Sequence, residues 1–272
     1  MYEKYYVKKR KRKRAAAIII FIGTVGCTAL GIVAFLGRFV GTFTVSLNNG
    51  NVNLALSLTS SFEKKESLLR IDHLAEFEEI EYATLPPSSE LDNEEFDYLS
   101  GARYDGDTLV GLDYFKYTFY LKNVGSKVAR YDFKLKIVES TMSDDGTNRY
   151  LDDTIRVMLY ENEGLSNDHN YVVYAKEAAE YNYLADGTRT RREFVTEYPL
   201  NNKEDENHPL AETFVSSAIV CEHSVSNFDV NEMKRYTVVT WLEGYDPQSD
   251  DEFPAPKGAK LKLGVEINAY EN

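Results

Sequence analysis

Apolar and polar residues alternate regularly along much of the chain after residue 40. The alternation is clearest in YFKYTFYLKN (114–123) and RYDFKLKIVE (130–139), where every second residue is large and apolar. A period of two places successive side chains on opposite faces of a β-strand. We therefore expect two strands with one face in a core, and we expect Lys116, Thr118 and Lys122 on the face toward solvent.

Turn segments separate these strands and others of the same kind. VGSKVA (124–129) supplies the turn between the first two, and NNGN (48–51) lies between FTVSL (43–47) and VNLALSL (52–58), which predicts a β-hairpin. Further strands are expected at TIRVMLY (154–160), NYVVYA (170–175), SSAIVCEHSV (216–225), RYTVVTWLEG (235–244) and AKLKLGVEIN (259–268). Eight or more half-buried strands joined by turns predict an all-β, antiparallel sandwich.

The segment from about residue 60 to residue 107 departs from this pattern. FEKKESLLRIDHLAEFEEIEY (62–82) has helical spacing in part, and residues 85–107 form an acidic connection. We interpret 60–107 as a decorated insertion between strands and not as a second domain. KEAAEYNYLA (176–185) is expected to form a short helix.

An uncharged apolar stretch lies near the N-terminus. AAAIIIFIGTVGCTALGIVAFLG (15–37) has 23 residues without a charge and is followed by Arg38. As a helix rising about 1.5 Å per residue, it is long enough to cross a hydrocarbon core of about 30 Å. The basic run KKRKRKR (8–14) lies directly before it. Such a run stays on the cytoplasmic side of a membrane.

This arrangement predicts a basic cytoplasmic segment (1–14), a transmembrane signal anchor (15–37) and an extracytoplasmic domain (38–272). A nuclear-import role for the basic run is disfavoured, because such a signal needs no transmembrane helix behind it. Lipid attachment at Cys27 and signal cleavage after Ala34 remain alternatives to an uncleaved anchor. We expect a single-pass protein of the cell membrane with its N-terminus in the cytoplasm, or a domain released after signal processing.

The charge distribution disfavours one class of partner. Residues 1–14 hold eight of the 31 basic residues and one of the 44 acidic residues, so the remainder carries a net charge of −20. A domain that acidic repels nucleic-acid phosphates, and we expect no nucleic-acid partner. Divalent cations and basic proteins would be its electrostatic complements.

Several of the predicted strands resemble those of a known family. YFKYTFYLKNVGSKVARYDFKLKI (114–137), TIRVMLYEN (154–162) and KRYTVVTWLEGYDP (234–247) are similar to the TasA/camelysin-like group, which are exported jelly-roll proteins of Gram-positive bacteria related to biofilm matrix-fibre subunits. The likeness covers most of residues 42–272. It implies a jelly-roll sandwich, export by a specialised signal peptidase, and assembly into fibres or association with them. The strong anchor without an obvious cleavage site departs from the fibre subunits.

The sequence contains no catalytic motif. Some members of the group are labelled metalloproteases, but a zinc protease needs two histidines one helical turn apart. The four histidines are isolated from one another: His73, His169, His208 and His223. Neither a Gly-x-Ser-x-Gly elbow nor a glycine-rich phosphate loop is present. We therefore expect no enzyme and no catalytic residue, with the histidines in loops or on the surface.

Two acidic loops are candidate calcium sites, because calcium takes about six to eight oxygen ligands and one short loop can supply several. The candidate ligands are Asp144, Asp145, Asp152 and Asp153 in residues 143–153, and Asp246, Asp250, Asp251 and Glu252 in residues 244–253. Neither loop matches the EF-hand pattern. The alternative is that these are solvated loops that blunt strand edges. Calcium is the one cofactor that the sequence suggests.

Two other residues have simple structural interpretations. Cys221 cannot pair with Cys27 across the predicted membrane, and it is expected to be a small buried residue. Trp241, the single tryptophan, is expected to be a large core residue late in the sandwich.

The sequence thus favours a non-enzymatic cell-surface protein with a structural or adhesive role. Its expected partners are the membrane, other surface or matrix proteins, and further copies of the chain that add a strand to a sheet edge. GTFTVSL (41–47) is the expected donor strand. Two alternatives remain, a membrane-tethered module that binds a ligand or calcium, and a camelysin-like metalloprotease.

Overall fold

The structure is a computed structural model, and it describes residues 39–71, 75–77, 79–80, 84–93, 100–143, 150–163, 169–176, 181–183, 189–191, 211–244 and 258–272. The chain divides into two compact units, residues 1–37 and 38–272, and the described residues all belong to the second. The predicted basic segment and transmembrane anchor therefore lie outside the described residues. Within the described ranges, no helix is long and apolar enough to cross a membrane.

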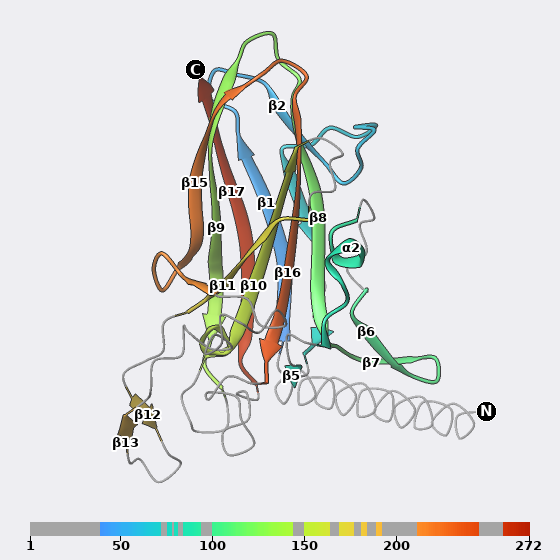
Figure 1. Cartoon of the computed structure of the whole chain (residues 1–272), viewed down its shortest axis with the longest axis vertical. Coiled ribbons are helices and arrows are strands. Elements are labelled where there is room, and N and C mark those ends of the chain that lie inside the picture. The colour runs from blue at the N-terminus through green and yellow to red at the C-terminus, as the bar shows by residue number, and fades with distance from the viewer. Residues whose placement is uncertain are drawn as a thin grey trace, which may run out of the picture. The chain divides into compact units, whose positions relative to one another are not determined.

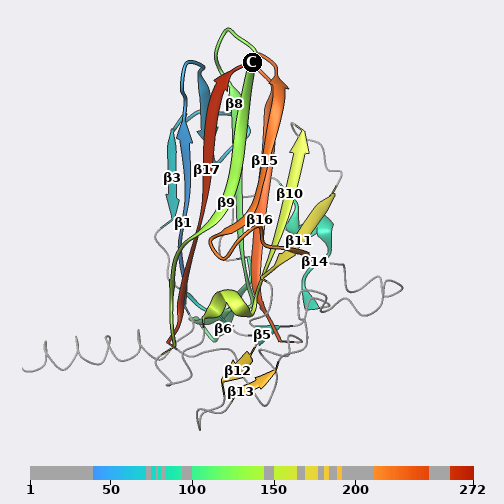
Figure 2. The ribbon, with the colours of Figure 1, turned by 90° about the vertical axis from the view of Figure 1, so that its left-hand side faces the viewer.

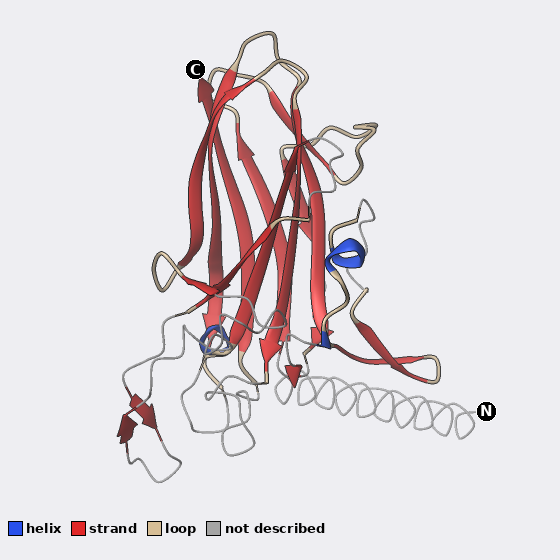
Figure 3. Cartoon of the chain, viewed as in Figure 1, coloured by secondary structure: helices blue, strands red, loops and turns tan. Residues whose placement is uncertain are grey.

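Strands make up most of the described residues (Figure 3). The six strands of sheet A lie in the order β15 (Ile219–Phe228), β9 (Ala129–Thr141), β17 (Lys260–Glu271), β1 (Phe39–Asn48) and β3 (Leu68–Ile71), with β4 (Ala75–Glu76) also paired to β1. The seven strands of sheet B lie in the order β14 (Ala211–Thr213), β11 (Tyr171–Ala175), β10 (Ile155–Glu163), β16 (Met233–Glu243), β8 (Tyr114–Asn123) and β2 (Leu54–Ser57), with β5 (Glu79–Ile80) paired to β16. Two small hairpins pair β6 (Ala102–Asp105) with β7 (Thr108–Leu112), and β12 (Tyr181–Tyr183) with β13 (Arg189–Arg191).

Sheets A and B face one another across one hydrophobic core (Figures 1 and 2). The ring of Phe43 on β1 lies 4.4 Å from that of Tyr117 on β8, and the ring of Phe133 on β9 lies 4.7 Å from that of Tyr236 on β16. The alternating apolar residues of 114–123 and 130–139 meet in this core, as the period of two requires. The prediction of an all-β chain is confirmed.

The predicted hairpin at 43–58 is wrong. β1 lies in sheet A, where it pairs with β17 in parallel, and β2 lies in sheet B, where it pairs with β8. The turn between them crosses from one sheet to the other, and the Asn49 side chain holds it by hydrogen bonds of 2.8 Å to both the backbone N–H and the carbonyl of Leu54. Gly50 has a positive φ, and a Cβ there would lie 2.5 Å from the Ala269 carbonyl oxygen. The turn at 124–129 likewise joins β8 of sheet B to β9 of sheet A.

The helical predictions are also corrected. The described part of 62–82 contains the strands β3, β4 and β5. β3 and β4 pair with β1, and β5 pairs with one end of β16, so these segments are extended and not helical. Residues 181–183, inside the predicted helix 176–185, form β12. The helical turns that the described residues do contain are α2 (Ser88–Leu91) and the 3-10 turn η2 (Leu151–Asp153).

The outer face of sheet B is buried, which the alternation did not predict. Lys116 and Thr118 are 2% and 0% exposed, and only Lys122 of the three predicted solvent-facing residues is partly accessible. The segment at residues 84–93, which includes α2, lies against this side of the sheet (Figure 1). Sheet B is therefore a middle layer, covered by sheet A on one face and by part of the 60–107 insertion on the other.

The core between the sheets supplies a first prediction. Replacing Phe119, which is fully buried between Tyr117 and Tyr236, by alanine removes a ring that the rigid strands cannot replace. We expect Phe119→Ala to lower the free energy of unfolding by about 3–5 kcal/mol in urea titrations. Val138→Ala, at a site 49% exposed, should change it by less than about 0.5 kcal/mol. Equal losses in the two variants would contradict this assignment of the core.

Candidate functional site

The outer face of sheet B carries a layer of polar and charged side chains that are buried together with a second apolar cluster. The apolar members come from strands β8, β10, β11 and β16 and from the segment that covers them: Leu91, Tyr114, Met158, Tyr160, Val173, Val239 and Trp241. The covering segment begins at Pro86–Pro87, and the carbonyl of Pro87 accepts hydrogen bonds from the N–H groups of Glu90 and Leu91. This single helical turn inserts Leu91 between the strands and places Asp92 directly after it.

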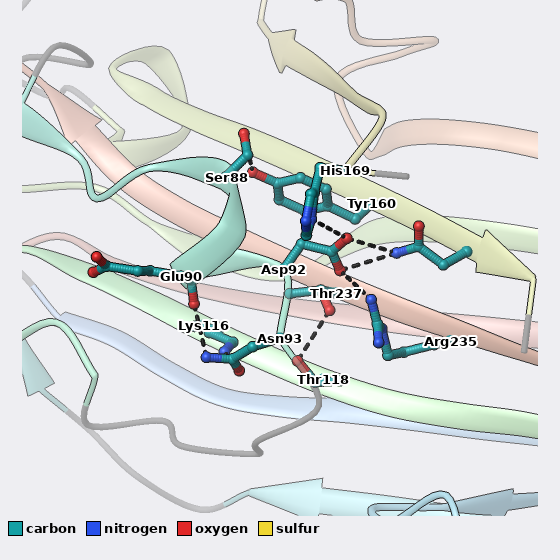
Figure 4. Close-up of polar contacts among 11 residues, drawn as sticks. Ser88, Glu90, Asp92, Asn93, Lys116, Thr118, Tyr160, His169, Arg235 and Thr237 are labelled. Carbon is teal, nitrogen blue, oxygen red and sulfur yellow. Dashed lines mark hydrogen bonds and ion pairs between the residues drawn. The ribbon is translucent and has the colours of Figure 1, made fainter. Parts of the chain in front are cut away.

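Asp92 is the centre of the polar layer. One of its carboxylate oxygens lies 3.0 Å from Nη2 of Arg235 on β16, and both side chains are fully buried. Nδ2 of Asn162 on β10 lies 2.9 and 2.8 Å from the two oxygens, and Nδ1 of His169, just before β11, lies 3.1 Å from Oδ2. Figure 4 shows these side chains converging on Asp92 from separate elements. Four segments of the chain are thus joined at one carboxylate.

Further polar contacts extend the same layer. Hydroxyls of Thr118 on β8 and Thr237 on β16 lie 3.0 Å apart, and the Tyr160 hydroxyl donates to Ser88 Oγ on α2 over 3.3 Å (Figure 4). Burial raises the pKa of Tyr160 well above its ordinary value, so this phenol keeps its proton and remains a donor. The first contact joins two neighbouring strands of sheet B, and the second joins the covering segment to the sheet.

The polar contacts of this layer hold the covering segment on sheet B. A carboxylate buried without a partner would be very unfavourable, and Arg235 supplies the opposite charge in the same dry environment. Both Asp92 oxygens already accept hydrogen bonds from protein groups. The Asp92–His169 pair resembles the base and orienting acid of a hydrolase, but His169 contacts a carboxylate that is engaged by Arg235 and Asn162. We assign the cluster to holding the insertion on the sheet.

The buried charge pair generates a second prediction. Asp92→Asn removes the carboxylate that pairs with the buried Arg235 guanidinium, and we expect the free energy of unfolding in urea to fall by about 3–5 kcal/mol. Replacing both members, as in Asp92→Asn with Arg235→Met, should recover most of that loss, because no guanidinium is then buried beside the changed residue. Asp132→Asn, which removes an exposed carboxylate that accepts from Ser224, is the matched control and should change stability little. A loss at Asp92 no larger than at Asp132 would refute the assignment.

A second polar cluster lies between the two sheets. Glu161 on β10 pairs with Nε2 of His223 on β15 over 2.9 Å, and it accepts a hydrogen bond of 2.6 Å from Nζ of Lys234 on β16. The hydroxyls of Tyr236 and Tyr131 lie 2.7 Å apart beside it, and burial raises the pKa of both phenols far above the ordinary value. The cluster therefore joins β9 and β15 of sheet A to β10 and β16 of sheet B through polar contacts.

Glu161 makes the stability of this cluster dependent on acid. Burial by itself would raise the Glu161 pKa, but the hydrogen bonds from His223 and Lys234 outweigh burial and lower it from 4.5 to about 2. Its contribution is complete above the unfolded-state pKa and is lost as pH falls toward about 2. We expect thermal unfolding midpoints to fall between about pH 5 and pH 2, and to fall less steeply in Glu161→Gln. An unchanged slope in Glu161→Gln, against Glu139→Gln as a control, would count against the cluster.

Two of the eight candidate calcium ligands lie within the described residues. Asp152 and Asp153 lie in η2, where Lys176 forms ion pairs with both carboxylates and Ser140 Oγ donates to Asp152. Burial opposes the charged form of Lys176, but the two carboxylates outweigh it and raise the Lys176 pKa. These two side chains are therefore engaged by an ammonium group. The other six candidates, at 144–145, 246 and 250–252, lie outside the described residues, and the described part of the chain contains no group of three or more His, Cys, Asp or Glu that could hold a metal.

Other predicted residues are placed as follows. Cys221 is buried in the core, and burial raises its thiol pKa to about 12, so it is not a reactive thiolate at neutral pH. Trp241 is buried as expected, although on the outer face of sheet B, where its Nε1 donates to Glu243 over 2.9 Å. The side chains of His169 and His223 are about one-third exposed and each pairs with a carboxylate.

Sequence reasoning missed Asp92, Asn162 and Arg235. Asn162 lies beyond the end of the strand expected at 154–160, Arg235 begins the strand expected at 235–244, and Asp92 lies in a connection with many acidic residues. The one local signal was Leu91, an isolated apolar residue before Asp92, because only the fold places Arg235 opposite Asn162. That signal becomes visible only when a cover for the outer face is assumed.

Comparison with known proteins adds no relative. No protein-family model matches the chain, and no curated protein sequence matches it. The resemblance to the TasA/camelysin-like group therefore stays a prediction.

Proposed function

We propose that this protein is a non-enzymatic cell-surface protein that acts through protein–protein association of its β-sandwich. Residues 15–37 would anchor it in the membrane with 1–14 in the cytoplasm, or be removed to release the domain. The sandwich would be of the jelly-roll type. In support, successive strands cross repeatedly between the sheets, from β8 in sheet B to β9 in sheet A, then to β10 in sheet B, and again along β15, β16 and β17. Such crossing connections are typical of jelly rolls.

The position of β1 in sheet A, between β17 and β3, is the observation that carries the proposal. β1 pairs in parallel with β17, the last strand, over most of its length, and antiparallel with β3 on its other side. Its inward residues Phe43, Val45 and Leu47 are at most 9% exposed. Parallel neighbours cannot be joined by a tight turn, so β1 is held beside β17 by its pairing and burial and not by a short connection.

The same position between β17 and β3 would accept β1 from a second copy of the chain. An identical strand would make the same ladder hydrogen bonds and bury the same three side chains, so the exchange would cost little at equilibrium. Because the donor and acceptor surfaces are different, each copy could give β1 to one neighbour and receive it from another, which produces an open chain of subunits. β1 begins at Phe39, so cleavage within 15–37 would free this strand while leaving it complete.

A disulfide between β1 and β17 tests this mechanism. Deleting 41–47 would also remove core residues, so a disulfide that fixes β1 in place is more informative than a deletion. Asn48 and Asn268 are directly opposite in the parallel ladder, and their exposed side chains are 3.4 Å apart, which suits a cystine. We expect the released domain with Asn48→Cys and Asn268→Cys to remain monomeric when oxidised as a monomer. When oxidised after assembly, it should give a ladder of covalent oligomers on non-reducing gels.

The matched control is Lys134→Cys with Glu222→Cys, which joins β9 to β15 and leaves β1 untouched. This variant should assemble in both redox states without a ladder. Assembly of the oxidised Asn48–Asn268 monomer at the wild-type rate would exclude exchange of β1. Sedimentation that shows no concentration-dependent growth in any form would remove the association proposal itself.

A further inference from the structure

Lys116 is an unusual residue for its place in the fold. Its side chain is 2% exposed, on the outer face of β8 and directly opposite Val239 of β16. The same face carries Tyr114, Met158 and Trp241 of the second apolar cluster. The amine of a lysine becomes a nucleophile once it has lost its proton, and here β8 fixes the position of that amine.

The Lys116 amine contacts the side-chain amide of Asn93. Nζ is hydrogen-bonded to Oδ1 of Asn93, and the Asn93 Nδ2 group donates to the Glu90 carbonyl over 2.9 Å (Figure 4). The amide is thus held at its nitrogen by α2 while its carbonyl faces the amine. Asp92, the preceding residue, is fixed by Arg235, so the backbone that carries Asn93 is itself held against the sheet.

We propose that Lys116 and Asn93 become joined by an intramolecular isopeptide bond. After Nζ loses a proton, its lone pair attacks Cγ of Asn93 and the Nζ–Cγ bond forms. A second Nζ proton passes to Nδ2 as the Cγ–Nδ2 bond breaks, so Nδ2 leaves as ammonia. This ammonia takes up the first proton that Nζ released, and one ammonium ion is the by-product. The amine and the amide are both present in the chain, and no oxidant, reductant or other reactant is consumed.

The geometry accounts for why a normally inert amide would react here. Two groups held in contact within one fold behave as if at very high concentration, with effective molarities that reach about 10⁵ M or more. Since the groups come from β8 and from the covering segment, the reaction can occur only after folding has brought them together.

The bond would make the attachment of the insertion permanent. Asp92 and Ser88 hold the segment at residues 84–93 to sheet B by contacts that can open. An amide between Asn93 and β8 cannot open with them, so the outer cover of sheet B would stay in place under pulling force or in the presence of proteases. This property would suit an exported structural domain, but the bond itself forms within one copy and does not depend on assembly.

Tryptic mass spectrometry of the purified full-length protein tests the proposal. The Asn93 peptide spans 71–103, and linkage at Lys116 blocks cleavage there, which leaves 104–122 intact. We expect one branched species that joins these two peptides and is lighter than their sum by one ammonia. Fragment ions should place the link at Asn93 and Lys116. Recovery of 71–103 and 104–116 as separate peptides from folded wild-type protein would overturn the proposal.

Three variants sharpen the result. Lys116→Arg and Asn93→Ala each remove one reacting group, and both should give unlinked peptides. Lys122→Arg changes the other lysine of β8 and should keep the link between Asn93 and Lys116, in a branched species that spans the same residues, because trypsin also cuts after arginine. Loss of ammonia that persists in Asn93→Ala would assign it to another asparagine and would refute the bond. Because the wild-type digest decides by itself, poor folding of a variant does not leave the question open.

Discussion

The long strands of sheet B, β8, β10 and β16, have both faces buried along most of their length, and this constraint governs the rest of the structure. A sheet in a two-layer sandwich normally buries one face and leaves polar residues on the other. Here the outer face also lies under protein, so each polar group on it must find a partner inside the molecule or impose a desolvation cost. The Asp92 network meets this requirement for a carboxylate, a guanidinium, an amide and an imidazole at once.

The two polar clusters do different physical work. The Asp92 cluster fastens a covering segment to the outside of sheet B, and the pairing of two fully buried charges makes loss of either partner costly. The Glu161 cluster lies between the sheets and joins strands of both, and its charged side chains are between 12% and 33% exposed. One cluster thus keeps the third layer in place, and the other holds the two sheets together where their cores meet solvent. Neither has the open ligand positions of a metal centre.

The two ends of the domain sequence meet in sheet A, where β1 and β17 lie in parallel. β1 therefore has a well-defined position between β17 and β3. The association that we propose uses this position, while the proposed bond between Lys116 and Asn93 lies on the outer side of sheet B, away from it. A domain with an exchangeable first strand and a covalently fixed cover would combine assembly with a rigid subunit.

The sequence by itself determined where most of the long strands lie and which of their residues enter the central core, because a period of two is a local property of the backbone. The runs that became β8, β9, β10, β16 and β17 could be recognised for this reason. It could not determine which strands pair. FTVSL and VNLALSL look like a hairpin, yet they belong to different sheets, since pairing is decided by distant strands such as β17 and β8. Nor could it determine that the outer face of sheet B is covered at Lys116, that Lys176 forms ion pairs with Asp152 and Asp153, or that Asp92 pairs with Arg235. Those outcomes depend on segments far apart in the chain, and only the tertiary structure brings them into contact.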